Sequence, residues 1–67
     1  MLSEQDIAVF DEYIDKFMLS DLSLIKIKDE NYPTNFLRKA LQQRIKDRDL
    51  TNLTAYTFLS ELYMEKV

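Results

Sequence analysis

The chain has 67 residues, a net charge of −3, and neither cysteine nor histidine. This length allows one domain, over residues 1–67, with a thin hydrophobic core. The missing residue types exclude disulfide bonds, thiolate zinc sites and cysteine nucleophiles, and they remove the most frequent acid–base catalyst. Without glycine there is also no phosphate-binding loop and no nucleophile elbow. We therefore expect no enzymatic activity, no metal ion and no cofactor.

Charge is distributed unevenly along the chain. Residues 1–21 carry six acids and one base, whereas residues 22–67 carry six acids and eight bases. This pattern indicates a nucleic-acid surface or an acidic arm, or simply two solvated surfaces that attract each other weakly. The acidic N-terminus lacks a signal-peptide pattern, and no apolar run reaches the roughly 18 residues of a membrane span. We expect a cytoplasmic protein that does not contact membranes, and the lack of cysteine fits that compartment.

Residues 4–19 are predicted to form an amphipathic helix. Ser3 and Asp6 resemble a capping box, with aspartate in place of the usual glutamate. Apolar side chains then recur at three- and four-residue steps, as they do on one face of a helix. That stripe consists of Ile7, Phe10, Ile14 and Phe17.

Residues 22–28 form an ambiguous segment. The run from Ile25 to Lys28 alternates apolar and basic residues, which is typical of a half-buried strand. A short helical turn or an extended linker fits the segment as well. Pro33 disfavours helical geometry in the residue before it, so any earlier helix should have ended.

Two more helices are predicted, over residues 34–47 and 50–66. Thr34 is the expected cap of the first, whose apolar stripe includes Leu37, Leu41 and Ile45. The second is expected from its apolar residues, among them Phe58 and Leu62. Tight two-residue hairpins usually need glycine or Asn-Gly, and this chain has no glycine.

The predicted fold is therefore an all-α, three-helix domain, or small helical bundle. Its expected core contains Phe10, Ile14, Leu41, Phe58 and Leu62. A domain of this size without disulfide bonds or a metal often gains stability by association, which favours a homodimer. Size and composition, without any motif, suggest a protein from a phage or mobile element.

The favoured function is protein–protein interaction, as a small acidic regulator, inhibitor or adaptor. The first helix offers an apolar stripe with acidic flanks, which suits a partner groove with a basic rim. Asp11 and Asp15 belong to those flanks, and as an isolated pair they lack the pattern of a calcium loop. Tyrosines suit the rims of interfaces because they combine an apolar ring with a polar tip. The predicted partner-binding residues are Asp11, Tyr13, Asp15, Tyr56 and Tyr63.

An alternative is a DNA-binding dimer. From Leu24 onward, the expected order of strand, helix and helix resembles the ribbon-helix-helix repressors and antitoxins, over residues 24–66. The resemblance implies paired strands in the major groove, with Leu24, Lys26 and Lys28 facing DNA. The net charge of −3 opposes contact with phosphates, and Asp49 would repel the phosphate that this family binds at the second helix.

Overall fold

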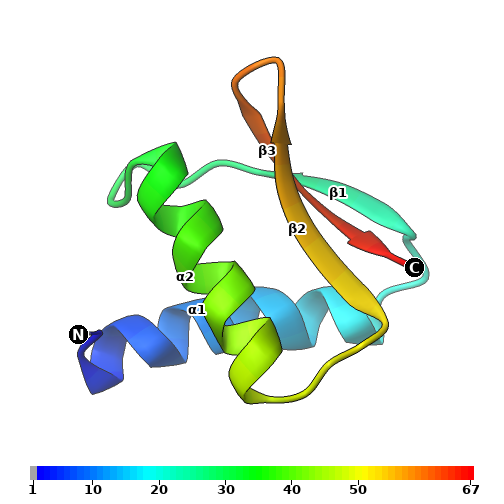
Figure 1. Ribbon diagram of the computed structural model, residues 1–67, viewed down its shortest axis with the longest axis horizontal. Coiled ribbons are helices and arrows are strands. Elements are labelled where there is room, and N and C mark those ends of the chain that lie inside the picture. The colour runs from blue at the N-terminus through cyan, green and yellow to red at the C-terminus, as the bar shows by residue number, and fades with distance from the viewer. Residues whose placement is uncertain (1) are drawn as a thin grey trace.

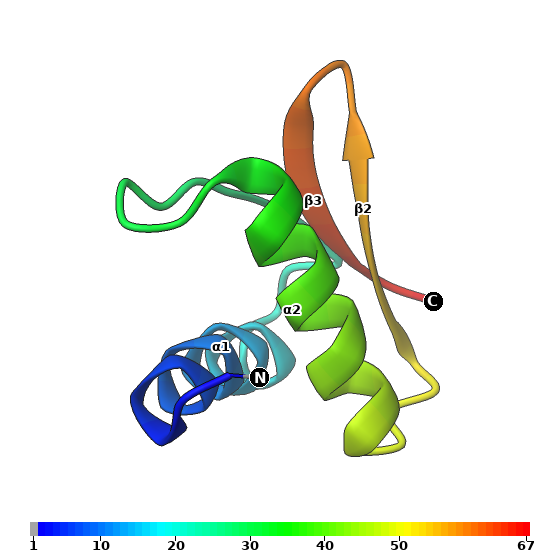
Figure 2. The same ribbon diagram turned by 60° about the vertical axis from the view of Figure 1, so that its left-hand side comes forward.

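The computed structural model describes residues 2–67 and shows an α+β domain rather than a bundle of helices. The elements follow the order α1 (Glu4–Leu19), β1 (Leu24–Ile27), α2 (Thr34–Asp47), β2 (Leu53–Phe58) and β3 (Glu61–Lys66). The three strands form one antiparallel sheet in the order β1-β3-β2. Both helices lie on one side of this sheet, with α2 against β2 and β3 (Figures 1 and 2).

Helix α1 matches the predicted bounds, which are confirmed. The Ser3 side chain accepts a hydrogen bond from the Asp6 N–H at 3.1 Å and so caps the first turn. The buried residues Phe10, Ile14 and Phe17 are spaced by four and three positions, so they share the face that packs into the core. The helix ends at Leu19, and Ser20 caps it by donating its N–H to the Phe17 carbonyl.

Helix α2 also has the predicted bounds, but its predicted cap is wrong. Pro33 occupies the cap position, and no side chain there bonds to the helix backbone. Thr34 is instead the first helical residue. The proline ring fixes φ near −60°, which defines the start of the helix without a hydrogen-bonding cap.

The linker before α2 is held against α1 by two tyrosines. The Tyr32 hydroxyl donates to Asp6 Oδ1 at 2.7 Å, and the Tyr32 ring packs edge-on against Phe10. The Tyr13 hydroxyl donates to Asp29 Oδ2 at 2.6 Å. These contacts fix the path of the chain between β1 and α2.

The predicted third helix over residues 50–66 is wrong, and with it the all-α fold and the helical bundle. Strands β2 and β3 form a hairpin there, joined by Leu59 and Ser60. Both turn residues adopt positive φ, 51° and 67°, so the hairpin forms without glycine. Leu62 and Met64 alternate with half-buried neighbours, which is the period of a strand and not of a helix.

The ambiguous segment at residues 22–28 contains the edge strand β1, which pairs with β3 from Leu24↔Glu65 to Ile27↔Leu62. The core lies between the sheet and the helices, and its buried members come from all five elements. Four of the five predicted core residues are buried: Phe10, Ile14, Leu41 and Leu62. Phe58 is the exception at 60% exposed, because in the hairpin it points to the opposite side of the sheet.

Candidate protein-binding surface

The side of the sheet away from the helices carries apolar side chains that no part of residues 2–67 covers. Because strand residues alternate between faces, Ile27, Leu62 and Ala55 point into the core, and their neighbours point outward. We call this outward side the open face. Its side chains are Leu24 and Lys26 from β1, Glu61, Tyr63 and Glu65 from β3, and Thr54, Tyr56 and Phe58 from β2.

The centre of the open face is a shallow groove of about 380 Å³, lined by Leu24, Tyr56, Phe58 and Tyr63. Tyr56 and Tyr63 lie directly opposite each other on neighbouring strands, with their rings stacked and their centroids 5.9 Å apart. Such cross-strand aromatic pairs stabilise the sheet by about 0.2–1 kcal/mol. The groove is thus a mainly apolar surface with two hydroxyl groups at its rim.

Both signs of charge lie beside the groove. Lys26 stands on β1, and Glu65 stands on β3, where its carboxylate accepts a hydrogen bond from the Tyr56 hydroxyl at 3.1 Å. Burial, followed by this contact with Glu65, raises the pKa of Tyr56 above its ordinary value of 10.0. The hydroxyl therefore remains a neutral hydrogen-bond donor at physiological pH.

The tip of the hairpin formed by β2 and β3 projects beyond the rest of the fold (Figure 1). It carries exposed apolar side chains. Phe58 is 60% exposed and Leu59 is 81% exposed. Leu59 also holds a left-handed conformation, which costs a residue with a side chain about 1–2 kcal/mol. This conformation closes the two-residue turn of the hairpin, and the exposed leucine side chain adds apolar surface at the end of the open face.

The predicted partner-binding residues fall into two separate groups. Tyr56 and Tyr63 meet on the open face, whereas Asp11, Tyr13 and Asp15 lie on α1. The Tyr13 hydroxyl is engaged by Asp29, and this bond is the main reason why the pKa of Tyr13 rises to about 12. A second groove, of about 220 Å³, lies beside Tyr13 between Val9, Glu12 and Lys16.

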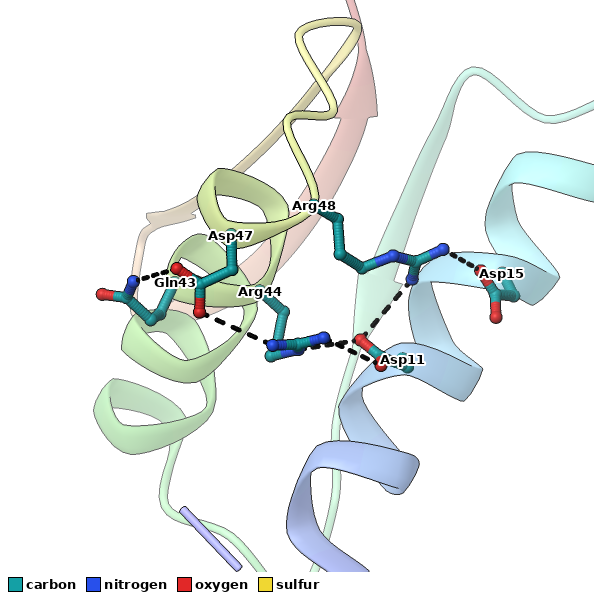
Figure 3. A network of polar contacts seen from close by, with 6 residues as sticks. All are labelled: Asp11, Asp15, Gln43, Arg44, Asp47 and Arg48. Atoms are coloured by element: carbon teal, nitrogen blue, oxygen red, sulfur yellow. Dashed lines mark hydrogen bonds and ion pairs between the residues drawn. The ribbon is translucent and has the colours of Figure 1, made fainter. Parts of the chain in front are cut away.

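Asp11 and Asp15 join α1 to α2 through two arginines (Figure 3). Arg44 bonds to both carboxylate oxygens of Asp11, at 3.0 and 3.1 Å, and Arg48 Nη2 bonds to Asp15 Oδ1 at 2.8 Å. Arg48 Nη1 lies 3.5 Å from Asp11 Oδ1, an ion pair without a hydrogen bond. The acidic flank of α1 is therefore largely occupied by its own chain.

The residues of the DNA-binding alternative lie on or beside β1, with Leu24 and Lys26 on the open face and Lys28 just after the strand. The second helix of a ribbon-helix-helix fold is absent, because residues 53–66 form the hairpin. Glu61 and Glu65 also lie on the adjacent strand. The structure therefore lacks the order of strand, helix and helix on which the resemblance to ribbon-helix-helix proteins was based.

Sequence reasoning missed the apolar role of Phe58 and Leu59, because both were assigned to a helix. The available signal was the alternation from Glu61 to Glu65, together with two threonines among the aromatic residues of β2. Comparison with family models, with curated proteins and with solved structures finds no match for this chain. Among residues 2–67, no helix is long and apolar enough to span a membrane, and no cluster of acidic side chains is suited to a metal ion.

Proposed function

We propose that this protein is a protein-binding module, a small regulator or adaptor that acts by covering a partner's surface and not by catalysis. The main support for this proposal is the open face, where an exposed groove is lined by Leu24, Tyr56, Phe58 and Tyr63. Exposed apolar and aromatic residues that are rimmed by polar groups are typical of protein-binding sites. Leu59, which is exposed at the end of this face, adds to the apolar surface that a partner could cover.

The partner's surface should be apolar at its centre and polar at its rim. Tyr56 and Tyr63 each offer a rigid ring and a hydroxyl, a combination that is frequent among the residues that contribute most to binding. Three short strands give a small contact area, so we expect a transient complex. A chain without cysteine fits a reducing compartment, and we place this function in the cytoplasm.

The test compares two surfaces of the same molecule. Pull-downs from the native host would use the intact protein, a Phe58→Asp/Tyr63→Ser variant, and a Leu19→Asp variant as control. Leu19 is 88% exposed at the end of α1, away from the open face. Its substitution by aspartate therefore adds the same negative charge outside the open face. We expect one protein that the intact chain and the control both retain and that the open-face variant loses.

Binding of that protein, once purified, would then be measured by calorimetry. We expect the open-face variant to raise Kd at least tenfold and the Leu19→Asp control to leave it unchanged. A partner that depends on α1 and tolerates the open-face changes would overturn the proposal. Recovery of nucleic acid instead, with an affinity that falls steeply as salt rises, would favour the DNA-binding alternative.

A further inference from the structure

The two edges of the sheet differ in how their backbone groups are used. The Lys66 N–H donates to the Ser23 carbonyl at 2.9 Å, which identifies this pair as a hydrogen-bonded one. In an antiparallel ladder such pairs alternate, so the backbone of Ile25 faces β3. The N–H and C=O groups of Leu24 and Lys26 must therefore point away from the sheet, toward its free edge.

The opposite edge, on β2, is partly occupied by the chain itself. Its two-residue turn directs the backbone groups of Leu53, Ala55 and Thr57 outward. The Leu53 N–H donates to the carbonyl of the preceding loop at 3.4 Å. The Ala55 carbonyl accepts a 2.7 Å hydrogen bond from Gln42 Nε2 on α2. Within residues 2–67, by contrast, no hydrogen bond engages the outward groups of β1.

We propose that the free edge of β1 binds the same edge of a second copy. The two β1 strands would run antiparallel about a two-fold axis at Ile25 and join the sheets into one of six strands. Leu24 of each copy would then lie opposite Lys26 of the other, and their outward N–H and C=O groups would bond to each other. This inference goes beyond the proposed function and does not depend on it.

The side chains of β1 fit a second copy and favour this register over the one centred on Lys26. A register centred on Lys26 would place two lysines opposite each other, which is destabilising, whereas the register centred on Ile25 pairs each lysine with a leucine. Each Lys26 would also lie in the same row as Leu24 and Glu65 of the other copy, so that opposite charges approach. Lys28 would lie opposite Leu22, which is 57% exposed in the single chain.

Proline substitutions at the two edges give a matched pair of variants. Lys26→Pro removes an N–H that faces the free edge, so the bonds from β1 to β3 remain. Thr57→Pro makes the corresponding change on β2. Sedimentation equilibrium should show a dimer for the intact chain and for Thr57→Pro, and a Kd at least tenfold higher for Lys26→Pro, with unchanged circular dichroism. A monomer at about 1 mM for the intact chain, or loss of the dimer only in Thr57→Pro, would overturn the proposal.

Cysteine substitutions test the register without a proline. Since the chain has no cysteine, each single variant reports one position. Ile25→Cys should form a disulfide between copies under mild oxidation, because the two Cα atoms would lie about 4.5 Å apart. Lys26→Cys should not, because its symmetry mate lies on the diagonal at about 7–8 Å. Preferential cross-linking of Lys26→Cys, or of Tyr63→Cys on the open face, would contradict the proposed pairing.

Discussion

Asp11 on α1 and Arg44 on α2 form a two-pronged ion pair, with Nε 3.0 Å from Oδ1 and Nη2 3.1 Å from Oδ2. The two side chains are 27% and 19% exposed, so neither is freely solvated. Hydrogen bonds between charged partners in this geometry are stronger than those between neutral groups. The pair therefore fixes how α1 lies against α2.

We predict that Asp11→Asn lowers the free energy of unfolding by about 1–3 kcal/mol, since it weakens a charge-assisted bond and leaves Arg44 with only the 3.5 Å contact to Asp47 as an ion pair. Asp15→Asn is the control, because Asp15 is 53% exposed and its pair with Arg48 should contribute about 1 kcal/mol or less. Urea denaturation at pH 7 measures both values. Equal losses in the two variants would contradict the special role of the Asp11 pair.

The contact between Asp11 and Arg44 also predicts that the stability of the fold depends on pH. The hydrogen bonds from Arg44 hold the pKa of Asp11 below the ordinary value of 3.8. A carboxyl whose pKa is lower in the folded state contributes stability above its unfolded pKa and loses it as pH falls through the folded pKa. We expect the free energy of unfolding to fall below about pH 5, and to fall less steeply in Asp11→Asn. Parallel curves from pH 5 to pH 2 would contradict this assignment.

Replacing the turn by Asn-Gly should stabilise the hairpin. Leu59 and Ser60 both adopt positive φ, for which Asn and Gly have the lowest cost. We expect Leu59→Asn/Ser60→Gly to raise the free energy of unfolding by about 1–2 kcal/mol, measured by thermal denaturation. If Leu59 contacts the partner, the same variant will bind less well although it is more stable. A lower Tm would show that the turn is not strained.

Two phenylalanines on opposite sides of the sheet should contribute very differently to the free energy of unfolding. Phe10 is fully buried, so Phe10→Ala should cost about 3–5 kcal/mol. Phe58 is exposed on the open face, so Phe58→Ala should change the free energy of unfolding by only about 0.5 kcal/mol. Chemical denaturation of both variants checks this contrast. A large loss for Phe58→Ala would mean that the open face is covered.

Residues 4–19 and 34–47 could be predicted because local signals define them. Their apolar stripes have helical spacing, and Ser3 and Pro33 mark their starts. The hairpin was missed because the usual marker of a tight turn is glycine. In this chain two residues with side chains hold the left-handed turn, and pairing along β2 and β3 offsets its cost.

The candidate site could be predicted only in part, since it depends on which strands become neighbours. Tyr56 and Tyr63 were predicted to bind a partner, and the hairpin places them side by side. Leu24 joins them from a strand that is distant in sequence, and its partner on β3 is Glu65. The acids of α1 were also expected at the surface, but their arginine partners come from a helix that no local pattern pairs with them.

The central strand of the sheet is also the last to be synthesised. Strand β1 emerges from the ribosome long before β3, and until then it has no neighbour on either side. Its pairing joins residues as distant as Leu24 and Glu65, so this step should limit the rate of folding. Neither β1 nor β2 has a strand partner until β3 is made, so the nascent chain should expose apolar surface to aggregation and to chaperones.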